Sequence, residues 1–204
     1  MYNLMDKRDF LFKFLPKGVR NKLKLDEEAL FSVTDQLTAD KITNELLKFI
    51  SCEATITDGT ACIGGNTFSL SRIFQHVNAV ELDKTRYEYL MHNLDALGVD
   101  NVSCYFGDIM DWLPNLDHTL LFLDPPWGGP EYKTQDLVDL YLSSIPLANV
   151  CERCCSTTKY IALKTPTNFN IDKFLEDTKS YMTLIHKNTK LRKLNLYLFE
   201  TFSS

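Results

Sequence analysis

Residues 54–83 read ATITDGTACIGGNTFSLSRIFQHVNAVELD and place a glycine turn between two β-rich segments. The first segment, Ala54–Thr60, runs into the turn CIGGN, and a helical pattern follows over Thr67–Gln75. The second segment, His76–Leu82, ends in acidic residues. A strand, a helix and a second strand in this order predict a parallel βαβ unit.

The alternation of strands and helices continues on both sides of this unit. A helical pattern over Ala39–Ile50 precedes it, with Thr38 or Asp40 as the cap. A helix over Lys84–Leu97 follows it. Further strands are expected at Val102–Phe106, Thr119–Leu123 and Tyr160–Lys164, with a closing hairpin of Met182–Lys187 and Leu194–Thr201. The sequence therefore predicts an α/β fold, with a mostly parallel seven-stranded sheet and an antiparallel C-terminal strand.

Composition indicates an ordinary globular chain. The 204 residues are 45% hydrophobic and 24% charged, which suits a single domain with a sizeable core. No apolar run approaches the roughly 20 residues of a membrane span, and the start MYNLMDKRDF lacks a signal-peptide profile. We therefore expect an intracellular monomer, nuclear or cytoplasmic, with no membrane association. Its six cysteines are then reduced thiols.

Two classes of site are disfavoured by composition and spacing. The cluster Cys151, Cys154 and Cys155 has no second CxxC or histidine pair near it, so no metal site is expected. The net charge of −5 excludes a broad cationic clamp for nucleic acid. Two local basic clusters, residues 13–24 and 187–193, could still grip a small nucleic-acid feature, although a solvated face is an equally good interpretation.

Acidic residues follow the strands at the ends where parallel α/β sheets bind ligands. Asp58 and the GGN turn follow the first strand, Glu81 and Asp83 end the second, and Asp108 follows the third. The turn DGTACIGGNT is not GxGxxG and has no Walker lysine, so a nucleoside cofactor without phosphates fits better. Glu81 could hold its ribose, and Asp108 or a neighbour its adenine amine, as S-adenosylmethionine requires. Each acid alone could equally be a helix cap or a surface carboxylate.

The turn DPPW, Asp124–Trp127, follows the fourth strand. Methyltransferases that act on exocyclic amines carry a [D/N/S]-P-P-[Y/F/W] turn at this place. A carboxylate or carbonyl that accepts the amine hydrogens can localise its lone pair, and the aromatic ring can stack on the base. The prolines stiffen the turn. The alternative is a plain turn with a core tryptophan.

Three motifs in the same order resemble the trimethylguanosine synthases, which are RNA cap guanine-N2 methyltransferases. They are KLDEEALFSVT at Lys24–Thr34, GGNT at Gly64–Thr67 and WGGPEY at Trp127–Tyr132, and the resemblance runs from about Arg8 to Phe199. It implies a Rossmann-like class I methyltransferase domain over residues 39–204, with a short helical extension, residues 1–38, packing on it. The implied reaction transfers a methyl group from S-adenosylmethionine to N2 of a 7-methylguanosine cap on RNA, giving a dimethyl or trimethyl cap.

The site residues expected on these grounds form three groups. The catalytic residues are Asp124, Pro125 and Trp127. The cofactor-binding residues are Thr34, Asp58, Ala61, Gly64, Asn66, Thr67, Glu81, Asp83, Asp108 and Asp124. The substrate-binding residues are Trp127, Tyr132, Lys164, Asn168, Lys190 and Arg192. Trp127 would stack on the cationic 7-methylguanine, and a cation over an indole face gains roughly 0.5–2 kcal/mol.

The chain departs from its relatives at two positions. Asp124 stands where the relatives usually have serine, and Thr167 stands where they often carry arginine beside a Pro-Asn pair. Lys164, Lys190 or Arg192 would then contact the cap phosphates. Two alternatives stay open. One is a guanine-N2 or adenine-N6 methyltransferase acting on other RNA or DNA, and the other is a catalytically inactive cap-binding module.

Overall fold

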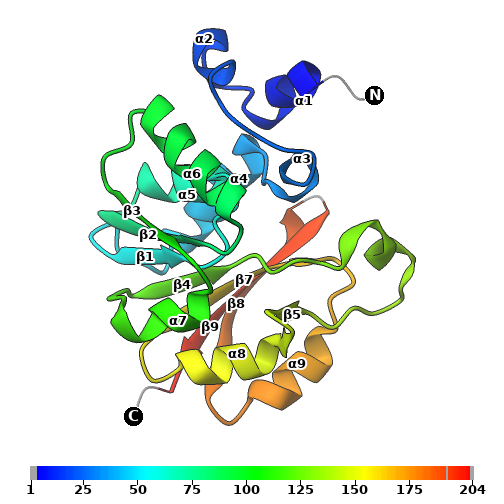
Figure 1. Cartoon of the computed structure of the whole chain (residues 1–204). Helices are drawn as coiled ribbons and strands as arrows, with labels where there is room; N and C mark the ends of the chain where they lie inside the picture. The colour runs from blue at the N-terminus through cyan, green and yellow to red at the C-terminus, as the bar shows by residue number, and fades with distance from the viewer. Residues whose placement is uncertain (1–3, 192, 203–204) are drawn as a thin grey trace. The chain divides into compact units, whose positions relative to one another are not determined.

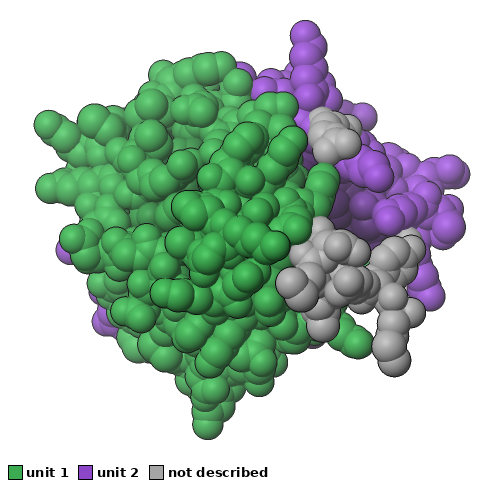
Figure 2. All heavy atoms as spheres, turned by 90° about the horizontal axis from the view of Figure 1, so that it is seen from above, with its two compact units in different colours: residues 1–112 green, residues 113–204 purple. Residues whose placement is uncertain are grey.

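The computed structural model describes residues 4–191 and 193–202, and the chain divides into two compact units (Figure 2). Unit 1 comprises Met1–Trp112 and unit 2 comprises Leu113–Ser204. Within the described residues, no helix is both long and apolar enough to cross a membrane.

Unit 1 contains three parallel strands in the order β3-β2-β1 (Figure 1). They are β1 (Thr55–Asp58), β2 (His76–Glu81) and β3 (Val102–Phe106). Its helices are α1 (Leu4–Leu11), α2 (Lys17–Arg20), α3 (Ala29–Ser32), α4 (Gln36–Leu46), α5 (Gly65–Ser71), α6 (Lys84–Ala96) and α7 (Ile109–Trp112). Nearly all of β1 and β2 is buried, as is usual for parallel strands covered on both faces.

Unit 2 contains the strands β4 (Leu120–Leu123), β7 (Tyr160–Pro166), β8 (Met182–Leu191) and β9 (Leu194–Thr201). A small hairpin is formed by β5 (Tyr141–Leu142) and β6 (Ile145–Pro146). Its helices are α8 (Leu147–Cys154) and α9 (Ile171–Thr178), with the 3-10 turns η1 (Leu113–Asn115) and η2 (Gly129–Thr134). Strand β7 is parallel to β4 and antiparallel to β9, which pairs antiparallel with β8.

The strand order of the sheet is β3-β2-β1-β4-β7-β9-β8. Strand β9 runs antiparallel to both of its neighbours, and the other pairings described are parallel. The predicted seven-stranded, mostly parallel sheet with an antiparallel C-terminal strand is therefore confirmed.

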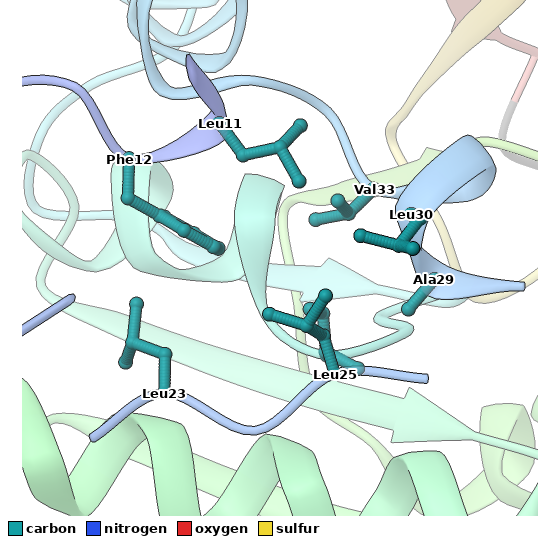
Figure 3. Packing of buried hydrophobic residues seen from close by; sticks show 8 residues of the cluster. Leu11, Phe12, Leu23, Leu25, Ala29, Leu30 and Val33 are labelled. Carbon is teal, nitrogen blue, oxygen red and sulfur yellow. The ribbon is translucent and has the colours of Figure 1, made fainter. Parts of the chain in front are cut away.

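The N-terminal extension packs on the glycine turn of unit 1. Its buried side chains form one apolar cluster with Ile63 (Figure 3). The members from the extension are Leu11, Phe12, Leu23, Leu25, Ala29, Leu30 and Val33. The Asn93 side chain of α6 joins the two parts, since its amide donates to the carbonyls of Lys24 and Ile63 at 2.9 and 3.0 Å. The short helices of the extension are thereby held in a defined place.

Two helices begin and end earlier than their sequence patterns predict. Helix α4 covers Gln36–Leu46 rather than 39–50, because its cap is Asp35, which accepts from the Thr38 N–H at 3.1 Å. The expected boundary at residue 38 therefore lies inside α4, and the proposed division of the chain stays a prediction. Helix α5 covers Gly65–Ser71 rather than 67–75, since the left-handed Gly64 (φ +99°) starts it directly.

Candidate active site

Asp58 holds the glycine turn together rather than presenting its carboxylate to solvent. It is fully buried at the end of β1, where its Oδ2 accepts a hydrogen bond from Thr67 Oγ1 at 2.7 Å. Ala61 is also buried, and its N–H donates to the Val80 carbonyl at 2.9 Å. These three residues, all expected to bind cofactor, give the turn its shape through contacts within unit 1.

The turn brings the backbone of the extension unusually close. A Cβ added at Gly65 would lie 2.6 Å from Val33 Cγ2 and 2.8 Å from the Thr34 carbonyl oxygen. Contacts that short do not occur, so only glycine allows residues 33 and 34 to lie against the turn. The extension therefore packs directly against the glycine turn.

Two buried polar atoms, one in the extension and one in the glycine turn, have no hydrogen-bond partner within residues 4–191 and 193–202. They are Thr34 Oγ1 and Asn66 Oδ1, in residues that are 5% and 8% exposed. A buried polar group without a partner costs about 1–3 kcal/mol, so such groups normally meet a ligand, an ion or an ordered water. Both residues were expected to bind cofactor, and their unsatisfied atoms fit that role.

Glu81 anchors the end of β2 with its carboxylate. Its Oε2 accepts from the Cys62 N–H and its Oε1 accepts from the Asp83 N–H, both at 2.8 Å. Arg86 Nε lies 3.5 Å from the same carboxylate. The side chain is 10% exposed, so it is fixed in place at the strand end where a ribose was expected to bind.

Asp83 and Asp108 act as caps. Asp83 Oδ1 accepts from the Arg86 N–H at the start of α6, at 2.9 Å. Asp108 Oδ1 accepts from the Met110 N–H at the start of α7, also at 2.9 Å. The helix-cap alternative weighed for each acid therefore applies to these two, which leaves Glu81 as the strongest candidate for a cofactor acid.

In unit 2, the DPPW turn contains a buried ion pair that spacing alone did not reveal. Asp124 follows β4, and its Oδ2 accepts from the Lys164 ammonium of β7 at 2.5 Å. The two side chains are 11% and 6% exposed. Burial raises the pKa of Asp124, and the attraction of the Lys164 ammonium only partly opposes this effect. Lys164 was expected to contact phosphate, whereas its ammonium is engaged by Asp124.

Trp127 and Tyr132 form an aromatic corner after the turn. Their ring centroids are 5.3 Å apart and the rings are nearly perpendicular, at 87°. The Lys164 ammonium lies 5.0 Å from the centroid of the indole ring, so the same lysine contacts both Asp124 and Trp127. Pro125 between them is buried, and Gly128 and Gly129 have positive φ, which lets the chain turn sharply into η2.

Asn168 braces this corner from the segment after β7. Its side-chain amide donates to the carbonyls of Tyr132 and Gln135, both at 2.8 Å. This contact makes Asn168 a positioning residue for η2. Lys190 is exposed on β8, with its N–H bonded to Asn188 Oδ1 at 2.9 Å, and Arg192 lies outside the described residues.

The cysteine cluster is part of the core of unit 2. The Cys154 and Cys155 thiols donate to the carbonyls of Val150 and Cys151, one turn earlier in α8. Burial raises the pKa of Cys154 to about 12 and that of Cys155 to about 11. Thiols this reluctant to ionise are poor nucleophiles and poor metal ligands.

Comparison with known proteins gives consistent matches. A family model described as RNA cap guanine-N2 methyltransferase matches residues 53–198. An uncharacterised protein of Acanthamoeba polyphaga mimivirus is 28% identical, over 88% of this chain and 80% of its own length. The trimethylguanosine synthase of Schizosaccharomyces pombe is also 28% identical, over 72% of this chain. The chain spans 64% of that yeast protein. The structure of a candidate RNA methyltransferase from Pyrococcus horikoshii superposes with a TM-score of 0.63 at 14% identity, covering 97% of this chain and 95% of its own.

The buried pair gives a prediction for stability. Lys164→Met leaves the Asp124 carboxylate buried without a cation, so at pH 7 the free energy of unfolding should fall by about 3–5 kcal/mol. Without Lys164, the folded-state pKa of Asp124 lies further above its unfolded value. The stability of the variant is therefore highest when Asp124 is protonated and falls as the pH rises through that pKa. Urea unfolding between pH 4.5 and 8 measures this.

The control is Asp124→Asn/Lys164→Met, which removes both charges. This double variant should recover most of the lost stability and should lack the added pH dependence. An equal loss for Lys164→Met at pH 5 and pH 8 would contradict the assigned pair.

Proposed function

The chain belongs to the RNA cap guanine-N2 methyltransferase family, and we propose that it transfers a methyl group from S-adenosylmethionine to the exocyclic N2 of a 7-methylguanosine cap. Methyltransferase activity follows from the family. The cap as substrate, and capped RNA as partner, rest on the resemblance to trimethylguanosine synthases together with the residues of the DPPW turn.

The glycine turn of unit 1 supports S-adenosylmethionine as cofactor. Thr34 and Asn66 offer buried acceptor atoms beside the turn, and Glu81 offers a fixed carboxylate at the end of β2. A carboxylate can accept both hydroxyls of a ribose. When bound, this cofactor supplies an electrophilic methyl group. The acceptor atoms hold a nucleoside without requiring any phosphate-binding group.

The aromatic corner of unit 2 supports a cationic base. Methylation at N7 gives guanine a positive charge, and a cation over an indole gains more than a neutral base does. The ammonium of Lys164 is close to the indole, but Asp124 neutralises it, so the pair does not repel a cationic ring. Tyr132 meets the Trp127 ring edge-on, which limits how far the indole can tilt.

The buried Asp124 carboxylate, paired with Lys164, supports transfer to an exocyclic amine. This observation carries the proposal. An ionised carboxylate accepts hydrogen bonds from N–H groups. The N1–N2 edge of guanine offers donors at both positions, whereas the corresponding edge of adenine pairs a donor with an acceptor. Lys164 favours the ionised form of Asp124 against the effect of burial. With the Pro125 carbonyl, Asp124 would aim the amine lone pair. As the N–C bond formed, the bond between the methyl group and the cofactor sulfur would break, leaving a neutral thioether, and the amine proton would pass to the Asp124 carboxylate.

The choice of cap tests the proposal. Activity should be readily detected on m7GpppG and be weaker on GpppG, with a KM about 2- to 30-fold lower for the methylated cap. Mass spectrometry of the cap dinucleotide after reaction identifies the methylated position and the number of methyl groups added. Equal KM and kcat on both caps would favour the alternative of a general guanine-N2 methyltransferase.

Glu81 tests the cofactor assignment. Glu81→Gln removes the charge, and S-adenosylmethionine affinity should fall about 10- to 100-fold in titration calorimetry. Asp83→Asn is the matched control, because asparagine can still cap α6. A larger loss for Asp83→Asn than for Glu81→Gln would transfer the ribose contact to Asp83.

The roles of Asp124 and Trp127 should separate in steady-state kinetics on the cap dinucleotide. Trp127→Ala removes a stack made in ground and transition state alike, so KM should rise about tenfold or more. Asp124→Ala should lower kcat about 10²–10³-fold, and Asp124→Asn less, since an amide oxygen still accepts a hydrogen bond. Asp124→Ala/Lys164→Met controls for the lysine left unpaired. Full kcat in a folded, cofactor-binding Asp124→Ala/Lys164→Met enzyme would refute the catalytic assignment.

A further inference from the structure

Positive charge is concentrated at the start of this chain. Residues 1–24 contain seven of the 22 lysines and arginines but only two of the 27 aspartates and glutamates, so they carry a formal charge of +5. The whole chain carries −5, which leaves −10 for the residues after 24. A polyanion is thus repelled by most of the chain and attracted by this segment.

The lysines of this segment are available to a ligand. Lys13, Lys17 and Lys22 are exposed, and no acid pairs with them among the described residues. Arg20 differs, because it pairs with Asp9 at 3.3 Å. Among the described residues, no ion pair therefore neutralises the charge of these three lysines.

Aromatic rings alternate with these cations on the outside of the segment. Phe10 and Phe14 are 56% and 59% exposed, while Leu11 and Phe12 between them are 4% exposed and point into the apolar cluster (Figure 3). The Lys13 ammonium lies 6.0 Å from the centroid of the Phe14 ring. Each exposed ring is a stacking surface with an ammonium near it in the sequence.

The backbone of the segment is anchored to the rest of unit 1 by buried side chains and a hydrogen bond. Besides the buried pair of Leu11 and Phe12, Leu23 is buried in the same cluster, and the Phe14 N–H donates to Gln36 Oε1 of α4 at 3.1 Å. The outward side chains are thus presented from a fixed backbone. A fixed platform loses less entropy on binding than a flexible tail would.

We propose that Phe10, Lys13, Phe14, Lys17 and Lys22 form a binding surface for the single-stranded RNA that follows the cap. The inference rests on the proposed function, because a cap substrate brings an RNA chain with it. Single-stranded RNA offers both chemistries that this extension surface matches, namely phosphates for the lysines and base faces for the rings. An acidic peptide would satisfy the lysines and leave the rings without stacking partners.

Binding of a fluorescein-labelled, uncapped 15-nucleotide RNA, measured by anisotropy, tests the surface directly. Three phosphate contacts predict a slope of about −2 in log K against log salt, so affinity should fall roughly twentyfold between 50 and 200 mM KCl. Lys13→Glu/Lys17→Glu/Lys22→Glu should abolish most of the binding at 50 mM KCl. Phe14→Ala should weaken binding about fivefold or more through lost stacking.

Methyltransferase kinetics provide the second readout. For the wild type at 50 mM KCl, KM should be at least about tenfold lower for a capped 15-nucleotide RNA than for m7GpppG. The triple variant should lose this difference while its kinetics on m7GpppG stay within about twofold of wild type. A thermal melt of each variant verifies folding.

Two matched triple variants locate the effect. Lys41→Glu/Lys159→Glu/Lys179→Glu makes the same charge change on scattered exposed lysines and should retain RNA binding. Lys187→Glu/Lys190→Glu/Lys193→Glu reverses the other basic cluster, and a selective loss of RNA binding there would overturn the proposal. Unchanged RNA affinity in the variants of the extension surface would also overturn the proposal. That result is expected if the surface binds a protein instead of RNA. Lack of activity on m7GpppG would refute the proposed function. The anisotropy data would still show whether the extension surface binds RNA.

Discussion

The DPPW turn of unit 2 depends on one buried ion pair. The carboxylate of Asp124 and the ammonium of Lys164 are both mostly buried, so neither charge is tolerable there without the other. Because the ammonium also lies 5.0 Å from the Trp127 ring centroid, one lysine contacts both the Asp124 carboxylate and the Trp127 indole. The two prolines before Trp127 stiffen the backbone, and the Asn168 amide holds η2 through the Tyr132 carbonyl. The proposed transfer to a weakly nucleophilic amine requires a rigid turn, and these contacts make the turn rigid without a bound substrate.

The fold was largely predictable because short runs rich in apolar, β-branched and aromatic residues mark its strands in the sequence. The predicted strands Val102–Phe106 and Leu194–Thr201 have the bounds that the structure shows, and the alternation of strands and helices predicted the α/β class. The order of the strands in the sheet was not predicted. Helix α4 was misplaced because several polar residues near its start can cap it, and the Thr38 hydroxyl itself donates to Asp35 at 2.7 Å. The β5–β6 hairpin was missed because Ser143 and Ser144 take positive φ without the glycine or asparagine that marks such turns.

The candidate site was predictable in its residue types and less so in their roles. Motif and strand-end position identified Asp58, Glu81 and Asp124, but only coordinates show that Asp58 bonds to Thr67 and Asp124 to Lys164. The two partners of each pair are far enough apart in the chain that no local pattern joins them. The ion pair of Lys164 had one sequence signal, which is the position of this lysine inside the apolar segment IALKTP. A buried ammonium needs a buried anion nearby.

The packing of the extension also has a consequence for the order in which the chain folds. Leu11 and Phe12 are synthesised before Ile63, which belongs to the cluster that buries them, and before Asn93, which completes the junction. Contacts between residues so distant in sequence form slowly, because a long loop must close first. This segment is thus made before the residues that bury it, and its apolar side chains stay exposed until α6 has been made.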